Sequence, residues 1–195
     1  MKKKDFDVLG ILLGIIIGTF LGFFISSKFI DDTEEVGAIE KESGFIYLVE
    51  VSQYDNANGA NNLIEELSNK NIYSIYILRD KYYYVYAGVY GSSVEAETMK
   101  ETLLNMGYSA KVNKEYILDY TNNILNDKEK EFYDYCINCY LLHLSSESYS
   151  IDYDTVDFET NIELFQDISM LNNLKKESLI MKTRLQIYSL LIKIK

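Results

Sequence analysis

The chain of 195 residues has no proline, no tryptophan, one histidine and two cysteines. The absence of proline disfavours a rigid proline-rich spacer and a polyproline ligand. One histidine excludes a multi-histidine metal site, and two cysteines cannot build a disulfide framework, so we expect no bound metal. Basic residues are scarce, at 19 against 30 acidic ones, and the net charge is −11. Because phosphate binding requires a basic surface, nucleic acid is not expected as a partner.

Tyrosine is the abundant residue, with 18 copies. Its ring is apolar and its tip is polar, which suits a binding surface. No Ser–His–Asp, Cys–His or metal constellation can be assembled around the one histidine. A glycosidase that uses a pair of carboxylates is not excluded, but acidic residues are too common in this sequence to identify two catalytic ones. The composition therefore favours a binding or scaffolding protein without a cofactor over an enzyme.

The N-terminus carries three lysines followed by an uncharged apolar run from Val8 to Ile25. At ~1.5 Å per residue, such a run can span a bilayer. The lysines favour a cytoplasmic N-terminus. We therefore predict a cytoplasmic tail at 1–7, a single transmembrane helix at 8–27 and an extracytoplasmic remainder. A cleaved signal peptide is the alternative, but the run exceeds the usual ~7–15 residues and no A-x-A-like site follows it.

Within this run, glycines recur with a spacing of four, which places them on one helical face; they are Gly10, Gly14, Gly18 and Gly22. Such a face lets a second helix approach closely, so it indicates self-association as a homodimer. The alternative is that glycine is simply common in membrane helices. Residues 28–43 are rich in aspartate and glutamate and are interpreted as an acidic linker.

A compact module follows at residues 44–116. Its segments alternate between strand-like and helix-like patterns, in the order strand 45–54, helix 56–70, strand 72–78, strand 82–90, helix 92–106 and strand 108–113. This βαββαβ order predicts an α+β, ferredoxin-like domain with a four-stranded, mostly antiparallel sheet and both helices on one face.

Alternation along the strands assigns side chains to the two faces of this sheet. The side chains expected to face the helices are Val49, Val51, Ile75, Ile77, Val85, Ala87, Ala110 and Val112. The opposite, open face then carries the candidate ligand-binding residues Glu50, Ser52, Tyr76, Tyr82, Tyr84 and Tyr86. Tyrosines on strands also simply stabilise sheets, which is the alternative interpretation.

Residues 45–113 resemble the SPOR (sporulation-related repeat) family. The resemblance rests on V-E-V-S-Q-Y (49–54), Ala60, Leu63, Y-Y-V-Y-A-G-V-Y-G-S-S-V-E-A (83–96), Gly107 and S-A-K-V (109–112). It implies binding of peptidoglycan at the division septum, with a preference for glycan strands stripped of stem peptides, through the exposed sheet face. A short tail, one membrane span and an outer SPOR domain is also a common layout of this family.

Three positions depart from the family's pattern. Glu50 stands where the family usually has glutamine, and Tyr84 stands where it often has arginine. Val89 stands where proline is common. An ionised Glu50 cannot donate a hydrogen bond, whereas Tyr84 can stack on a sugar ring. The resemblance therefore implies a sugar site weighted toward tyrosine.

Residues 117–195 have helical periodicity and resemble no family that we can name. We predict one helix at 116–144 and a second that begins after a cap at Asp154 or Thr155. Residues 176–194 form a third helix or a continuation of the second. Cys136, Cys139 and His143 share one helical face, and core packing is a simpler explanation than zinc or redox chemistry.

The last 25 residues carry six basic residues against one acidic residue, whereas residues 117–170 carry two against twelve. We expect the basic end to fold back on the acidic helices, with anionic lipid or wall polymer as the alternative.

Taken together, these patterns predict a non-enzymatic, single-pass cell-membrane protein of cell division or sporulation that binds peptidoglycan glycan strands at the septum. The first alternative is an envelope scaffold that binds a division protein without glycan contact. A carbohydrate-active enzyme is the second.

Overall fold

The computed structural model describes residues 43–151 and 160–195. The predicted membrane helix, its four glycines and nearly all of the acidic linker lie outside these ranges. In the part of the chain that the structure describes, no helix is both long and apolar enough to cross a membrane.

The sheet domain consists of β1 (Phe45–Tyr54), α2 (Ala57–Asn69), β2 (Ile75–Arg79), β3 (Tyr82–Tyr90), α3 (Ser93–Asn105) and β4 (Lys111–Tyr116). The strands lie in the order β2-β3-β1-β4, and all three strand pairs are antiparallel. The predicted βαββαβ order and four-stranded sheet are therefore confirmed.

Local signals fix the ends of these elements. The Asn56 side chain accepts a hydrogen bond from the Gly59 amide and caps α2, and Ser92 accepts one from Val94 and caps α3. Gly107 has a φ of +88°, the left-handed conformation that commonly follows a helix. Asp80 and Lys81 also have positive φ, at 46° and 75°, and form the two-residue turn between β2 and β3.

The first face of the sheet packs under α2 and α3, as predicted. Val49, Val51, Val85 and Ala87 are all buried there. From the two helices they meet Ala60, Leu63, Leu67, Ala96 and Leu103. These residues form the first of two hydrophobic cores.

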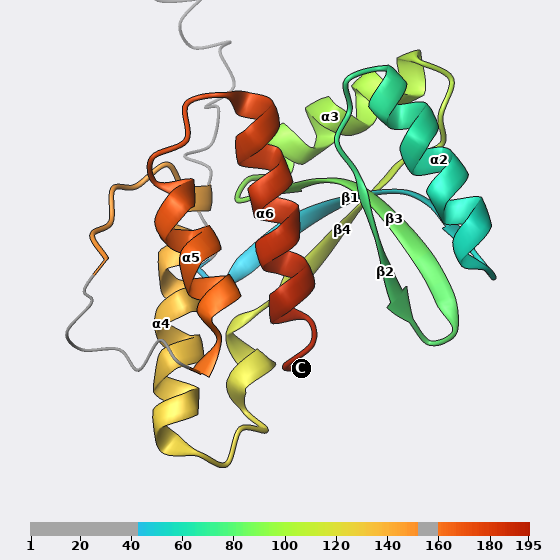
Figure 1. Ribbon diagram of the computed structural model, residues 1–195. Coiled ribbons are helices and arrows are strands. Elements are labelled where there is room, and N and C mark those ends of the chain that lie inside the picture. Colours follow the sequence, from blue (N-terminus) through green and yellow to red (C-terminus); the bar gives the residue numbers. More distant parts are fainter. Residues whose placement is uncertain (1–42, 152–159) are drawn as a thin grey trace, which may run out of the picture. The chain divides into compact units, whose positions relative to one another are not determined.

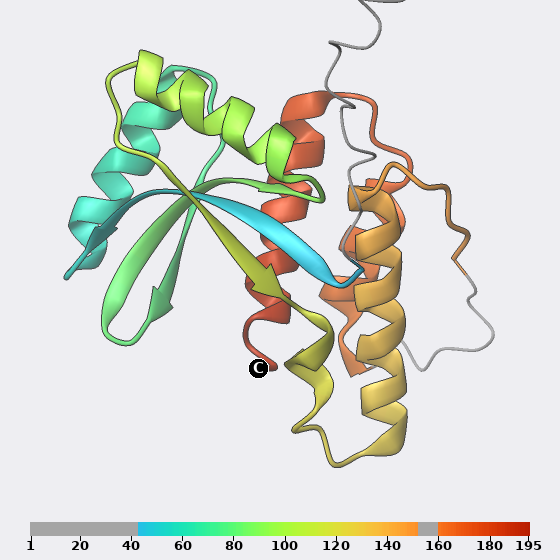
Figure 2. The same cartoon turned by 180° about the vertical axis from the view of Figure 1, so that it is seen from behind.

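The second face was expected to be open, and most of this expectation is wrong. Among the described residues after the sheet, a 3₁₀ helix at Leu118–Thr121 is followed by α4 (Asp127–Leu144), α5 (Ile162–Leu171) and α6 (Glu177–Leu191). Figures 1 and 2 show α2 and α3 on one side of the sheet and α6 on the other. The rings of Tyr86 on β3 and Tyr188 on α6 meet edge to face, with centroids 6.0 Å apart.

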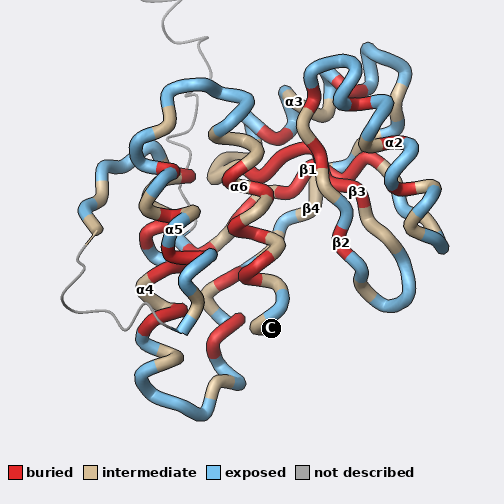
Figure 3. The backbone as a smooth tube through the Cα atoms, viewed as in Figure 1, coloured by how far each residue is buried: buried red, intermediate tan, exposed pale blue. Residues whose placement is uncertain are grey.

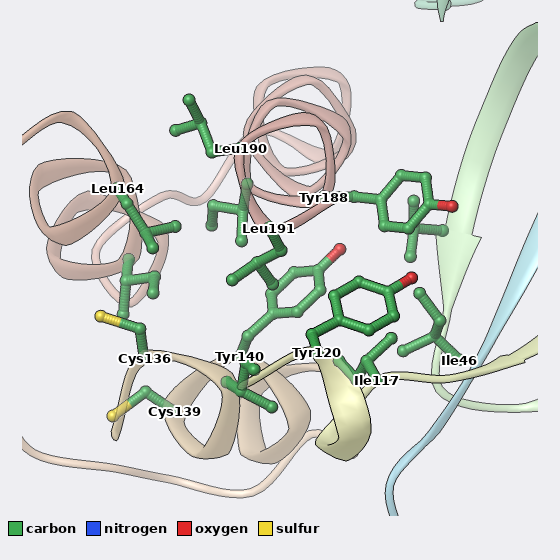
Figure 4. Close-up of a cluster of buried hydrophobic side chains, with 14 of the residues drawn as sticks. Ile46, Ile117, Tyr120, Cys136, Cys139, Tyr140, Leu164, Tyr188, Leu190 and Leu191 are labelled. Atoms are coloured by element: carbon green, nitrogen blue, oxygen red, sulfur yellow. The ribbon is translucent and has the colours of Figure 1, made fainter. Parts of the chain in front are cut away.

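A second hydrophobic core runs from this face into the C-terminal helices (Figure 4). Ile46, Leu48 and Val89 contribute to it from the strands. In Figure 3 the central strands and the inner sides of the helices are coloured as buried. Burying these apolar side chains is energetically favourable, so a second layer of helices packs on this face. Alternation along the strands shows only which residues share a face, and does not show whether that face is covered.

The predicted faces of β2 are inverted. Cross-strand partners share a face, and Ile75 and Ile77 lie opposite Tyr86 and Tyr84, so both isoleucines belong to the second face. Tyr76 lies opposite Val85 and therefore belongs to the first face. The short strand is apolar on both faces, so its alternation does not fix its phase; the two-residue turn, which pairs Arg79 with Tyr82, fixes it.

The C-terminal helices differ from prediction at their ends. The single helix predicted at 116–144 is wrong, because the chain forms the 3₁₀ helix and then restarts at Asn126, which caps α4. Asn161 caps α5. Asp154 and Thr155 lie outside the described residues. The predicted helix at 176–194 is confirmed as α6.

The basic end folds back on the acidic helices, as predicted, because α6 packs against α5 and its buried side chains share the second core with α4 and α5. The last lysine has a different ion-pair partner. Lys195 donates to Glu115 on β4 at 3.1 Å, rather than pairing with the acidic helices.

Candidate functional site

A recess lies on the second face, and we call it the tyrosine hollow. It has a volume of about 390 Å³. Its lining consists of Leu48, Glu50, Arg79, Asp80, Tyr84, Tyr86, Asn113, Lys114 and Glu115. All four strands and the β2–β3 turn contribute, so the fold brings together residues from four separate segments. Three of the six predicted ligand-binding residues lie here: Glu50, Tyr84 and Tyr86.

Glu50 is held from β4, the neighbouring strand. It lies opposite Lys111 in the register, and the Lys111 Nζ is 3.0 Å from its Oε1. Asn113 Nδ2 donates to its Oε2 at 2.7 Å. Only 5% of Glu50 is exposed. The carboxylate at the family's glutamine position is thus fixed in place, and it offers acceptors rather than donors to a ligand.

The two tyrosines of the hollow differ in burial. Tyr86 is 2% exposed, and burial raises its pKa to about 12. Tyr86 lines the hollow and at the same time packs in the second core. Tyr84 is only half-buried, so its ring is the aromatic surface that a ligand in the hollow can reach.

The other three predicted residues lie elsewhere. Tyr82 is exposed and pairs with Arg79 at the turn, outside the lining of the hollow. Tyr76 is on the first face, where its ring meets that of Tyr83 edge to face at 5.3 Å. Ser52 lies opposite Val85, and register shifts interrupt β1 on both sides of Glu50. A β-bulge adds a residue and moves later side chains to the opposite face, which simple alternation cannot anticipate.

Glu115 is the residue that sequence reasoning missed. Its Oε1 accepts from Tyr120 Oη at 2.6 Å and from Lys195 Nζ at 3.1 Å. Its Oε2 accepts from Tyr188 Oη at 2.7 Å and from Arg79 Nη2 at 3.1 Å. These partners come from β2, the 3₁₀ helix, α6 and the chain's last residue. One carboxylate therefore ties the sheet to the C-terminal region.

Burial alone would raise the pKa of the Glu115 carboxyl. The hydrogen bonds from Tyr120 and Tyr188, then the Arg79 charge and the bond from Lys195, outweigh it and lower the pKa to about 2. Glu115 is therefore ionised at any physiological pH. The sequence around Glu115 does not distinguish it from the other acidic residues, because Arg79, Tyr188 and Lys195 are far away along the chain. The nearby Tyr120 is one of many tyrosines.

The cysteines are core residues, as predicted. Cys136 and Cys139 are both free and buried, and burial raises the pKa of each thiol (Figure 4). Burial, followed by the nearby Arg184 charge, lowers the pKa of His143 to about 4. Within residues 43–151 and 160–195, no cluster of three or more His, Cys, Asp or Glu side chains has the geometry of a metal site.

Comparison with known proteins confirms the family resemblance of the sheet domain. Residues 43–114 match the family model of the SPOR domain. The solution structure of the peptidoglycan-binding domain of the B. subtilis cell wall lytic enzyme CwlC is similar to this chain, with 29% sequence identity and a TM-score of 0.35. That similarity covers 37% of this chain and 92% of the CwlC domain. No curated protein matches the chain.

Proposed function

We propose that the SPOR domain at residues 43–114 binds the glycan strands of peptidoglycan at the division septum, and that the tyrosine hollow is its binding site. The observation that carries the proposal is the position of this hollow. It lies on the sheet face that the family resemblance implies, with the half-buried Tyr84 among its lining residues.

The chemistry of the hollow suits a sugar. The Tyr84 ring can stack on the apolar face of a pyranose, which contributes about 1 kcal/mol beyond area burial. The Glu50 carboxylate accepts hydrogen bonds from sugar hydroxyls, and Asn113 can both donate and accept. Because Glu50 and Asn113 are already held by each other, they lose little freedom when a ligand binds.

Glycan binding is a better proposal than glycan cleavage. A glycosidase needs a carboxylic acid with a raised pKa as proton donor, in addition to a second carboxylate. In the hollow, the pKa of Glu115 is shifted in the opposite direction, to about 2, and Glu50 is paired with Lys111. Glu115 is therefore not suited to protonating a leaving group at neutral pH.

The membrane anchor and the place of action are also part of the proposal. The uncharged run from Val8 to Ile25 supports a single span at 8–27, with the N-terminus in the cytoplasm and the SPOR domain outside the cell membrane. Self-association through the four glycines and contact with a division protein remain predictions.

The test is co-sedimentation of the full chain, in a non-ionic detergent, with purified sacculi. Tyr84→Ala should weaken binding by about five- to ten-fold, since a ten-fold change corresponds to ~1.4 kcal/mol. Tyr86 is unsuitable for this test, because it is buried in the second core.

Tyr83→Ala is the matched control. It removes the same side chain from the same strand, but from the opposite face of the sheet, where Tyr83 packs against the first core and lines neither the tyrosine hollow nor the recess that adjoins it. If Tyr84→Ala stays folded and binds sacculi as the wild type does, the hollow is not the site and the scaffold alternative takes first place. A fluorescent fusion of the wild type should gather at septa in dividing cells.

A further inference from the structure

A second recess adjoins the tyrosine hollow, and we call it the lysine hollow. It lies between β2 and the turn that follows α6, and it has a volume of about 710 Å³. Arg79 and Asp80 line both recesses, so the two meet at the β2–β3 turn. From the C-terminal region, Ser189, Ile192, Lys193 and Lys195 contribute to the lysine hollow. This side of it therefore lies outside the SPOR match at 43–114.

The two hollows differ in charge. The tyrosine hollow has three acidic residues, Glu50, Asp80 and Glu115, against Arg79 and Lys114. The ammonium group of Lys114 lies over the Phe45 ring at 4.1 Å. The lysine hollow has three cationic residues, Arg79, Lys193 and Lys195, against Asp80 alone. A cationic recess is notable in a chain whose net charge is −11.

Glu115 positions two of these three cations. It accepts hydrogen bonds from both Arg79 and Lys195, at 3.1 Å each. Tyr188 donates to the same carboxylate and also accepts from Arg79. Arg79 uses Nη2 for these two partners, and its Nε is buried without a partner, so the donors left for a ligand are those on Nη1. Lys193 is exposed beside them.

The chemistry of the proposed ligand matches this pair of hollows. Peptidoglycan glycan alternates a neutral amino sugar with one that bears a lactyl group. The carboxyl of that group is an amide while a stem peptide is attached, and becomes a free carboxylate when the peptide is removed. Adjacent sugars of a stripped strand therefore differ in charge, as the adjacent hollows do.

We propose that the lysine hollow is a second glycan subsite, in which Arg79, Lys193 and Lys195 bind the free lactyl carboxylate of the sugar next to the one in the tyrosine hollow. This inference rests on the proposed function. It assigns a binding role to the C-terminal region, whose last turn completes the subsite. It also gives a physical basis for selecting strands without stem peptides, since only those carry the carboxylate.

The experiment compares two double variants of the full chain that remove the same charge from the two ends of α6. Lys193→Gln with Lys195→Gln removes two positive charges from the lysine hollow. Lys175→Gln with Lys176→Gln removes two exposed charges just before α6 and serves as the control. The probes are sacculi treated with an amidase that removes stem peptides, and untreated sacculi. Both are first freed of attached phosphate polymers with hydrofluoric acid.

On stripped sacculi, the 193/195 variant should bind about three- to ten-fold more weakly than wild type, and its binding should depend less on salt. The control variant should bind as wild type does, and on untreated sacculi the two variants should not differ. Converting the carboxylates of stripped sacculi to methylamides should weaken wild type to the level of the 193/195 variant. Because Lys195 also pairs with Glu115, Lys193→Gln alone should give part of the loss without altering that contact.

Equal binding of wild type and the 193/195 variant to stripped sacculi would overturn the subsite. A charge dependence seen only before the hydrofluoric acid treatment would overturn the assignment to sugar carboxylates, because phosphate would then be the anion. These outcomes are separate from failure of the proposed function, in which the wild type itself does not bind sacculi or Tyr84→Ala has no effect.

Discussion

Glu115→Gln should destabilise the folded chain in a manner that depends on pH. In the unfolded chain this carboxyl titrates near its ordinary pKa of 4.5, whereas in the folded chain the pKa is about 2. A difference of about 2.5 in pKa corresponds to about 3 kcal/mol of stability. Since Glu115 is 12% exposed at its side chain, solvent screens little of this contribution.

The sign follows from the direction of the shift. A lowered pKa in the folded state contributes stability that is complete above the unfolded pKa and is lost as pH falls toward the folded pKa. The free energy of unfolding of Glu115→Gln should therefore lie about 3 kcal/mol below that of wild type at pH 7. At pH 3 the gap should shrink to less than half, because Glu115 of the unfolded wild type is then already protonated.

The measurement is urea denaturation of the full chain in non-ionic detergent, followed by circular dichroism, at pH 7 and pH 3. Taking the difference between variant and wild type cancels the titration of the other acids. Glu97→Gln is the control, because Glu97 forms only an exposed pair with Lys100 on α3 and should cost less than ~1 kcal/mol. A gap for Glu115→Gln that is absent, or that is the same at both pH values, would refute the reasoning.

Two further predictions concern the cores. Val85→Asp places a charge in the fully buried first core under α2 and α3, so the variant should lose its cooperative urea transition, and a normal transition would contradict the assigned face. Cys136→Ser together with Cys139→Ser should lower the free energy of unfolding by about 2 kcal/mol or somewhat more, without changing sacculus binding by the folded protein. Stoichiometric zinc in the purified wild type would contradict the purely structural role of the cysteines.

Much of the sheet domain was predictable because its signals are local. The capping side chain of Ser92 and the helix stop at Gly107 act within a few residues, and period-two alternation in β3 separates Val85 from Tyr84 and Tyr86. The motif at 83–96 carried the family resemblance, which the SPOR match at 43–114 confirms.

The phase of β2 and the position of Ser52 were not predictable from the same alternation. Ile75, Tyr76, Ile77 and Leu78 are all apolar enough for either face, so their pattern is degenerate. The two-residue turn and the register shifts around Glu50 settled the faces. Both are properties of strand pairing, and pairing joins residues that are distant in sequence.

The sequence by itself determined the βαββαβ order, the helix caps, the buried cysteines and the tyrosine-rich strand from which the candidate site is built. Only the tertiary structure decided that α6 packs on the second face, and that the site is a hollow rather than an open platform. It also decided that Glu115 joins Arg79, Tyr188 and Lys195. The physical reason is that coverage of a sheet face and the pairing of a buried charge depend on which distant segments meet, and no local pattern records that.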